Sequence, residues 1–123
     1  MWIAHRCATA ATVRSTPRCG CAFEHLRIGG VAVNDLAVYD PVGDTWTGLA
    51  AMPTVRDHLT AETVGGKLYA IGGRNKDISA ITGANEVYDP ATNRWTSLTA
   101  MPTPRAGHGS GVLNGRIQLF GGE

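Results

Sequence analysis

A chain of 123 residues, 43% of them hydrophobic, is long enough for one domain with a hydrophobic core. Its 11 basic and 10 acidic side chains nearly cancel, so charge gives no argument for binding nucleic acid or an anionic membrane. No apolar run reaches the roughly 18–20 residues of a membrane-spanning helix. Sixteen glycines and six prolines favour short strands and tight turns over helices.

The first 27 residues differ in composition from the rest. Up to Phe23 they contain three arginines, no acidic residue and many Ala, Thr and Ser, a composition found in transit peptides. Residues 9–13 nevertheless echo residues 60–64, and Ile-Gly-Gly recurs before residue 31 and before residue 74. We therefore interpret residues 6–30 as the first half of a degraded repeat, in which an insertion replaces the second strand. The insertion is either a natural loop or an artefact of the gene sequence.

The three cysteines all lie in the first 21 residues, at Cys7, Cys19 and Cys21. An odd, clustered number gives no disulfide framework for the remaining chain. With His5 and His25 they form a metal-like cluster, but a zinc site usually has two ligand pairs, with about two to four residues inside a Cys pair. We predict unpaired thiols and no metal site.

The following segments predict short antiparallel strands. Residues 36–39 are apolar and stop at Asp40-Pro41, because proline cannot donate a hydrogen bond to a sheet. We expect Asp44, and Asn93 further along, to close turns by bonding nearby backbone amides. Gly65-Gly66 and Asn114-Gly115 are two-residue hairpin signals between apolar segments.

Residues 38–73 recur 49 residues later as residues 87–122, with the same residue at 15 of 36 positions. Each copy combines Tyr-Asp-Pro, a Trp seven residues after the Tyr, and a double glycine. In a repeat of about 50 residues, this combination resembles the kelch motif.

The resemblance implies an all-β fold, a partial kelch β-propeller with four-stranded antiparallel blades. It covers about residues 28–123, with a first blade to about residue 49, a second over 55–98 and half of a third over 104–123. Residues 1–27 are then an irregular leader or a degraded first half-blade. Propellers have about four to eight blades, so this chain alone would not close the ring. We favour a fragment of a longer propeller over a ring closed by several copies, which cyclic contacts would allow.

Packing explains the residue types of the motif. Blades diverge outward, so aromatic residues fill the outer gaps, and each would remove about 150–250 Å² from water. Small residues such as Gly109 and Gly111 suit the crowded innermost strand. The predicted structural residues are Tyr39, Trp46, Gly72, Gly73, Tyr88, Trp95, Gly121 and Gly122.

Arg56 and Arg105 both follow Met-Pro-Thr, on the connection that enters a new blade. In kelch domains that bind acidic peptides, arginines at this position lie on the ligand-binding face, so the resemblance implies bidentate pairing with a carboxylate. The alternative, which we take as the default, is that each arginine bonds backbone carbonyls and fixes the connection. His108 lies three residues after its arginine and His58 only two after its own, so they cannot form a matched pair of metal ligands.

The connection between Gly73 and Val87 is six residues longer than its counterpart in the first copy. Loops longer than the fold requires often carry binding residues. We therefore add Arg74, Asn75 and Asp77 to the predicted ligand-binding residues. The alternative is a surface loop without a ligand.

The sequence contains no hydrolase nucleophile elbow, phosphate-binding loop or zinc-protease motif, and we predict no catalytic residue and no cofactor. The predicted function is an interaction module that binds a protein or peptide, with an acidic one best suited to the arginines. The alternative is part of a sugar-acting propeller enzyme, either a sialic-acid isomerase or a galactose-oxidase-like enzyme. Such an enzyme would need a polar pocket with a shifted acid or base at the axis.

Overall fold

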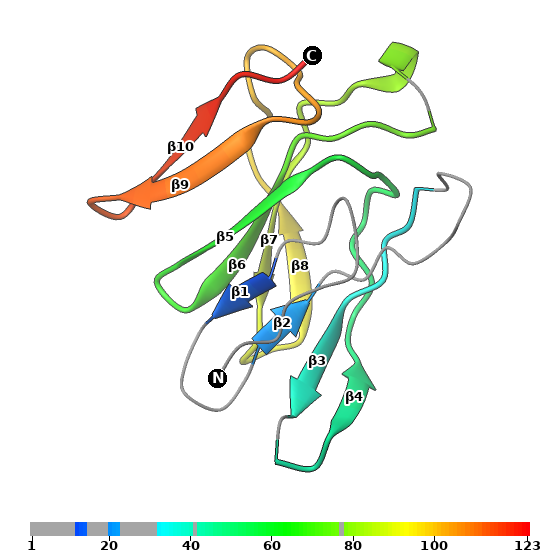
Figure 1. Ribbon diagram of the computed structural model, residues 1–123, viewed down its shortest axis with the longest axis vertical. Coiled ribbons are helices and arrows are strands. Elements are labelled where there is room, and N and C mark those ends of the chain that lie inside the picture. The colour runs from blue at the N-terminus through cyan, green and yellow to red at the C-terminus, as the bar shows by residue number, and fades with distance from the viewer. Residues whose placement is uncertain (1–11, 15–19, 23–31, 41, 77) are drawn as a thin grey trace.

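The computed structural model describes residues 12–14, 20–22, 32–40, 42–76 and 78–123. The strands form three antiparallel sheets that follow one another along the chain (Figure 1). The first sheet contains, in spatial order, β1 (Thr12–Arg14), β2 (Gly20–Ala22), β3 (Ala37–Asp40) and β4 (Thr45–Gly48). The second contains β5 (Thr60–Val64), β6 (Lys67–Ile71), β7 (Asn85–Asp89) and β8 (Arg94–Ser97). The third contains β9 (Gly109–Leu113) and β10 (Arg116–Phe120), and the short helix η1 (Ile78–Ala80) lies between β6 and β7.

The first sheet corrects one expectation. We expected an insertion to replace its second strand, but Gly20–Ala22 is that strand, and it pairs with both β1 and β3. The first sheet thus begins at Thr12, inside the segment whose composition differs from the rest. Alternation can identify a strand of five residues, whereas a three-residue strand such as Gly-Cys-Ala gives no periodic signal.

The two hairpin signals are confirmed. Gly65 and Gly66 have φ values of 58° and 76°, and Asn114 and Gly115 have values of 51° and 71°. Two consecutive residues with positive φ define the turn whose twist matches the flanking strands.

The turns after Tyr-Asp-Pro differ from the prediction. Asp40 and Asp89 accept turn-closing backbone hydrogen bonds, each at 2.9 Å, and Asn93 does not close its own turn as expected. Asn93 has φ of 51°, and its Oδ1 accepts hydrogen bonds from the hydroxyl of Tyr88 at 2.8 Å and the backbone N–H of Ala50 at 2.9 Å. Asn93 therefore joins the second sheet to the connection that leaves the first.

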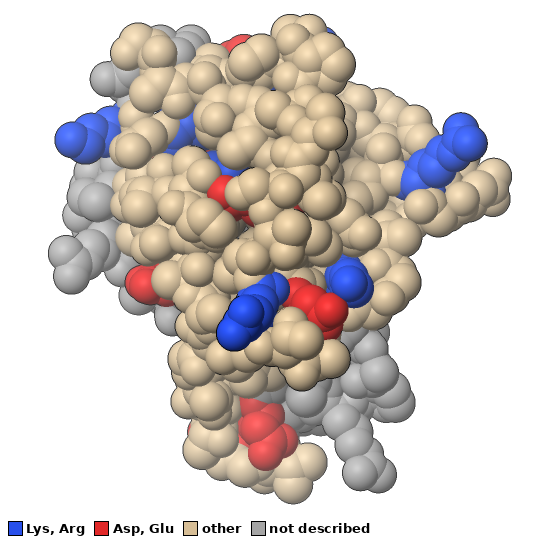
Figure 2. All heavy atoms as spheres, turned by 180° about the vertical axis from the view of Figure 1, so that it is seen from behind, with Lys and Arg blue, Asp and Glu red and all other residues tan. Residues whose placement is uncertain are grey.

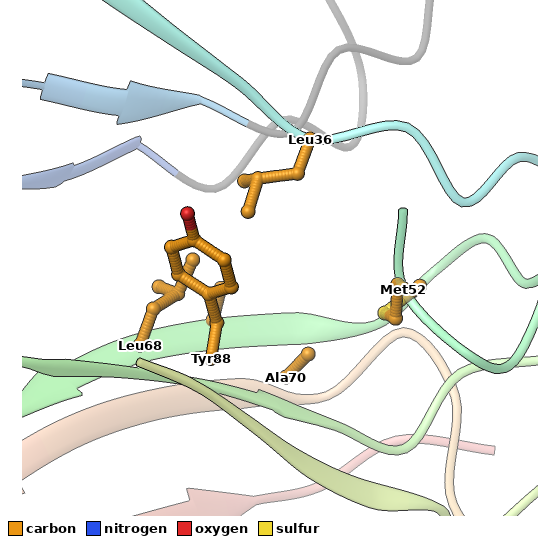
Figure 3. Packing of buried hydrophobic residues seen from close by; sticks show 6 residues of the cluster. Leu36, Met52, Leu68, Ala70 and Tyr88 are labelled. Carbon is orange, nitrogen blue, oxygen red and sulfur yellow. The ribbon is translucent and has the colours of Figure 1, made fainter. Parts of the chain in front are cut away.

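The hydrophobic core lies between the second sheet and the segments that flank β3 and β4 of the first sheet. Its buried residues are Leu36, Met52, Ala61, Leu68, Ala70 and Tyr88. Figure 3 shows Leu68 and Tyr88 pointing from the second sheet toward Leu36, which directly precedes β3. Tyr88 is directly opposite Trp95 across β7 and β8, and their rings lie 5.3 Å apart and tilted by 48°. The Tyr and Trp of the motif thus form one cross-strand pair.

From the sequence we expected all of the motif's aromatic residues to be buried, but their burial differs. Tyr88 is fully buried and Trp95 is half-buried, but Trp46 is 49% exposed. Trp95 packs on Ala50 of the preceding repeat, and the position equivalent to Ala50 one repeat earlier is residue 1, outside the described residues. The side chain of Tyr39 also lies outside the description, although its backbone pairs with Trp46.

Close packing requires the double glycine rather than the glycines of the innermost strand. A Cβ on Gly72 would lie 2.6 Å from the carbonyl oxygen of Arg105, and one on Gly73 would lie 2.5 Å from that of Asp57. Both residues also have positive φ, of 68° and 101°. A Cβ on Gly111 would meet nothing within 4 Å, so crowding does not explain that glycine.

Candidate functional site

The long connections after residue 48 lie at one end of the sheets. The strands alternate in direction, so the β3–β4, β5–β6, β7–β8 and β9–β10 turns lie at the opposite end (Figure 1). We call the end that carries residues 49–59, 72–84, 98–108 and 121–123 the connection end. Arg56, Arg105, Arg74 and Asn75 of the predicted ligand-binding set all belong to it. Asp77 lies outside the described residues.

Arg56 is buried at this end, with a side chain that is 0% exposed. Its Nη2 donates to the carbonyl oxygen of Ala70 at 3.0 Å and pairs with Oε2 of Glu86 at 3.1 Å. Burial lowers the pKa of Arg56, and the negative charge of Glu86 partly opposes this shift. Thr54 donates to the other oxygen of the Glu86 carboxylate at 2.5 Å. Arg56 is therefore enclosed by its own sheet, bonded to a backbone carbonyl oxygen and paired with Glu86.

Arg105 occupies the same motif position but is partly exposed. Its Nη1 donates to the carbonyl oxygen of Gly121 at 2.7 Å. Within the described part of the chain no carboxylate pairs with it, and the counterpart of Glu86 in its repeat would fall after Glu123. The same motif residue is thus buried in one repeat and partly exposed in the next.

Arg74 is the centre of a polar cluster that joins the second and third sheets. Its guanidinium contacts Asp57 Oδ1 at 3.5 Å, His58 Nε2 at 3.1 Å and Glu123 Oε1 at 2.5 Å. The backbones of Asp57 and Arg74 also exchange two hydrogen bonds, of 2.7 and 2.9 Å. We call Asp57, His58, Arg74 and Glu123 the corner cluster.

The contacts of His58 determine its tautomer. A guanidinium only donates hydrogen bonds, so Nε2 of His58 must accept the one from Arg74. Nδ1 then carries the proton and donates to Asp57 at 2.9 Å. Asp57 is buried, and it orients both His58 and Arg74.

His58 also has an unusual backbone conformation. Its φ is 51°, and the equivalent residue in the next repeat is Gly107, with φ of 63°. The two residues are in contact, because the N–H of Gly107 donates to the carbonyl oxygen of His58 at 2.9 Å. Non-glycine residues in the left-handed region are uncommon, and they concentrate where function or packing requires the side chain.

The long β6–β7 connection folds back on itself. The backbone N–H of Asn75 donates to the carbonyl oxygen of Ala80 at 3.1 Å, and that of Thr82 donates to the carbonyl oxygen of Gly73 at 2.9 Å. Asn75 and Lys76 are exposed at its tip. This connection therefore presents polar side chains from a hydrogen-bonded frame.

His108 has a different environment from His58. It is buried, and its Nε2 lies 3.0 Å from the Thr60 hydroxyl. Burial lowers the pKa of His108, with a further contribution from the charge of Arg105. The described residues contain no group of three or more His, Cys, Asp or Glu arranged to hold a metal ion. Cys7, Cys19 and His25 of the N-terminal cluster lie outside the description.

A groove of about 410 Å³ lies between the second and third sheets. Tyr69 and Ile71 of β6, Ile117 and Leu119 of β10 and the connection at residues 99–102 line it. The groups whose pKa is shifted, Arg56, Asp89 and His108, do not belong to its lining. This groove therefore does not combine a pocket with a shifted acid or base.

Charge is dispersed over the described residues of one face (Figure 2). On the face shown in Figure 2, the described Lys and Arg side chains are separated by neutral ones, and acidic side chains lie between them. Among the described helices, none is long and apolar enough to cross a membrane.

The corner cluster was not predicted as a unit. Of its members, sequence reasoning selected only Arg74 as a candidate binding residue. Two signals could have identified the others. Arg74 and Glu123 both directly follow a double glycine, and His58 stands where the next repeat has glycine.

Comparison with known proteins agrees with the repeat. The family model of the Kelch motif matches residues 56–102. Kelch-like protein 31 from Danio rerio is 46% identical over 46 residues, which make up 37% of this chain and 7% of that protein.

The solved structure of YjhT superimposes with a TM-score of 0.73 at 27% identity, over 90% of this chain and 33% of that chain. The chain thus spans about a third of that structure and a small part of the fish protein. The motif match, the repeated Tyr-Asp-Pro, Trp and double glycine, and the consecutive antiparallel sheets lead to one conclusion. Residues 56–102 carry the Kelch motif, and the chain folds as part of a kelch-type β-propeller.

Proposed function

We propose that this chain is a kelch-repeat interaction module that binds a protein or peptide with acidic side chains at the connection end. The main support is the convergence of two guanidinium groups on one short segment. Arg105 donates to the carbonyl oxygen of Gly121, and Arg74 pairs with the carboxylate of Glu123.

The geometry supports recognition of a carboxylate. The backbone N–H of Gly73 donates to the carbonyl oxygen of Arg105 at 2.8 Å, so the backbones that carry the two arginines are adjacent. Glu123 shows that Arg74 can accept a carboxylate partner, and Arg105 has none among the described residues. Bidentate hydrogen bonds from a guanidinium to a carboxylate are stronger and more selective than neutral ones.

The proposed binding residues are Arg105 and Arg74, with Asn75 and His58 beside them. Arg56 is not included, because its guanidinium is enclosed with Glu86 and Ala70. The sugar-enzyme alternative has no support from this groove, because none of the groups with a shifted pKa lines it.

A selection from a random peptide display library tests the proposal, with the full chain as bait. We expect enrichment of sequences with Asp or Glu. A synthetic peptide from the selection should bind Arg105→Ala at least about tenfold more weakly, which corresponds to about 1.4 kcal/mol.

Arg116→Ala is the matched control, because Arg116 is an exposed arginine at the opposite end of the third sheet. It should leave binding unchanged. Enrichment of peptides without acidic residues, or equal losses in the two variants, would contradict binding at the connection end.

A further inference from the structure

His58 stands at a position whose backbone conformation favours glycine. Its φ is 51°, and the equivalent residue of the next repeat is Gly107, with φ of 63°. Positive φ is disfavoured for a residue with a Cβ and not for glycine. The backbone therefore gives no reason for a histidine here, and the reason lies in the contacts of its side chain.

The ring of His58 joins a buried carboxylate to an arginine. Its Nδ1 donates to Oδ1 of Asp57 at 2.9 Å, and its Nε2 accepts from Nη2 of Arg74 at 3.1 Å. Asp57 is buried, so its carboxylate has a fixed position. The ring passes this fixed position on to the guanidinium of Arg74.

These contacts give each nitrogen of Arg74 a direction. Nε lies 3.5 Å from Oδ1 of Asp57, and Nη2 contacts His58. Nη1 pairs with the carboxylate of Glu123, whose side chain is 40% exposed. Two of the nitrogens thus face the segment that precedes β5, and Nη1 is the one that a carboxylate at the surface reaches. A carboxylate from a partner would exchange with that of Glu123 at this nitrogen.

The next repeat replaces all of the interacting residues together. The positions equivalent to Asp57, His58 and Arg74 are occupied there by Ala106, Gly107 and Glu123. Where the arginine is absent, the histidine and the aspartate are absent too, and glycine takes the position with positive φ. A histidine that serves the arginine predicts this joint replacement, whereas a histidine needed for the turn itself does not.

We propose that His58 is a positioning residue for carboxylate recognition, which fixes the guanidinium of Arg74 so that Nη1 faces an acidic side chain of the partner. The inference rests on the proposed function, because it assigns a role within the same binding surface. A side chain that is fixed before binding loses less conformational freedom in the complex. His58 therefore strengthens binding without a contact of its own to the partner.

Three substitutions at residue 58 separate the contacts of the ring. His58→Asn tolerates positive φ and can donate to Asp57 in place of Nδ1, but its amide is too short to reach Arg74. His58→Gln places an amide oxygen near the position of Nε2, where it can accept from Arg74, although glutamine does not favour this φ. His58→Gly matches the next repeat and removes both contacts.

The affinity for the synthetic acidic peptide of the display selection and the stability in urea are measured for each variant. We expect His58→Asn and His58→Gly to bind the peptide at least about fivefold more weakly than the original chain, and His58→Gln to restore most of the loss. His58→Gln should nevertheless be less stable than His58→Asn. Affinity and stability then change in opposite directions, which a purely structural role of His58 does not produce.

NMR of the ring nitrogens tests the arrangement without any ligand. In the neutral form of His58 we expect the proton on Nδ1, because Nε2 accepts from the guanidinium. The His58→Asn variant identifies the signals by their loss. A proton on Nε2 would overturn the inference.

The binding data distinguish failure of the inference from failure of the proposed function. If Arg74→Ala weakens binding but His58→Asn and His58→Gly do not, or if His58→Gln binds no better than they do, the inference alone is wrong. If Arg105→Ala weakens binding and Arg74→Ala does not, the inference is also wrong, while binding at the connection end stands. If neither arginine variant weakens binding, the proposed function fails and the inference fails with it.

Discussion

The indole Nε1 of Trp95 donates a 2.7 Å hydrogen bond to the carbonyl oxygen of Ala50, while Asn93 accepts one from the N–H of the same residue at 2.9 Å. The β7–β8 hairpin thus binds both the backbone N–H and the carbonyl oxygen of Ala50. These bonds join the second sheet to the connection that leaves the first, across 43 to 45 residues of sequence.

Replacement of Trp95 should therefore weaken the contact between the two sheets. Trp95→Ala removes a half-buried ring packed on Tyr88 together with its hydrogen bond, and we expect a loss of about 3 kcal/mol in the free energy of unfolding. Trp46→Ala is the control at the same motif position. Because about half of the Trp46 side chain is exposed, Trp46→Ala should lower the free energy of unfolding, measured in urea, by less than about 1 kcal/mol. Similar losses in the two variants would contradict this account.

The buried ion pair gives a second prediction. Glu86→Ala leaves the Arg56 guanidinium enclosed without its counter-charge, and we expect destabilisation of about 3–5 kcal/mol. Arg56→Met combined with Glu86→Leu removes both charges, so its effect should be clearly smaller than the sum of the single substitutions. A double-mutant cycle by chemical denaturation measures the coupling. Additive effects would show that the two side chains act independently.

The double glycine gives a third prediction. Gly72→Ala introduces a Cβ 2.6 Å from a carbonyl oxygen at a φ of 68°, and we expect a loss of about 2 kcal/mol or more. Gly107→Ala has a similar φ of 63° but meets no atom within 4 Å, so only the backbone cost of about 1 kcal/mol applies. Thermal unfolding of the two variants separates steric overlap from backbone strain. Equal shifts in Tm would exclude overlap as the reason for glycine at position 72.

His108 gives a prediction for pH. Its pKa is lowered in the folded state, so the unfolded chain binds more protons as the pH falls below the usual value of about 6.5. The contribution of neutral His108 to stability is therefore fully present above that pH and is lost as the pH falls through the folded pKa. We expect Tm to fall between pH 7.5 and 5, and His108→Gln to reduce the slope. An unchanged slope would assign the pH dependence to other groups.

Local features of the sequence determined the fold class, the strands of the second and third sheets and the hairpin turns. Gly65-Gly66 and Asn114-Gly115 specify their turns through their own backbone preferences, so these turns depend on local sequence and not on distant contacts. The repeat then identified the kelch motif, because equal spacing of Tyr-Asp-Pro, Trp and the double glycine requires no knowledge of contacts. The short β2 strand was missed, since three residues carry too little periodicity.

Only the tertiary structure decided which motif residues are buried and which are exposed to solvent. Arg56 and Arg105 occupy the same position of the repeat, two residues after Met-Pro-Thr, but Glu86 on β7 encloses one, and the third sheet as described has no strand to enclose the other. The corner cluster likewise combines three segments separated by tens of residues. Burial and charge pairing depend on what packs against a residue from elsewhere in the chain, and a repeated sequence specifies the same side chain without specifying that neighbour.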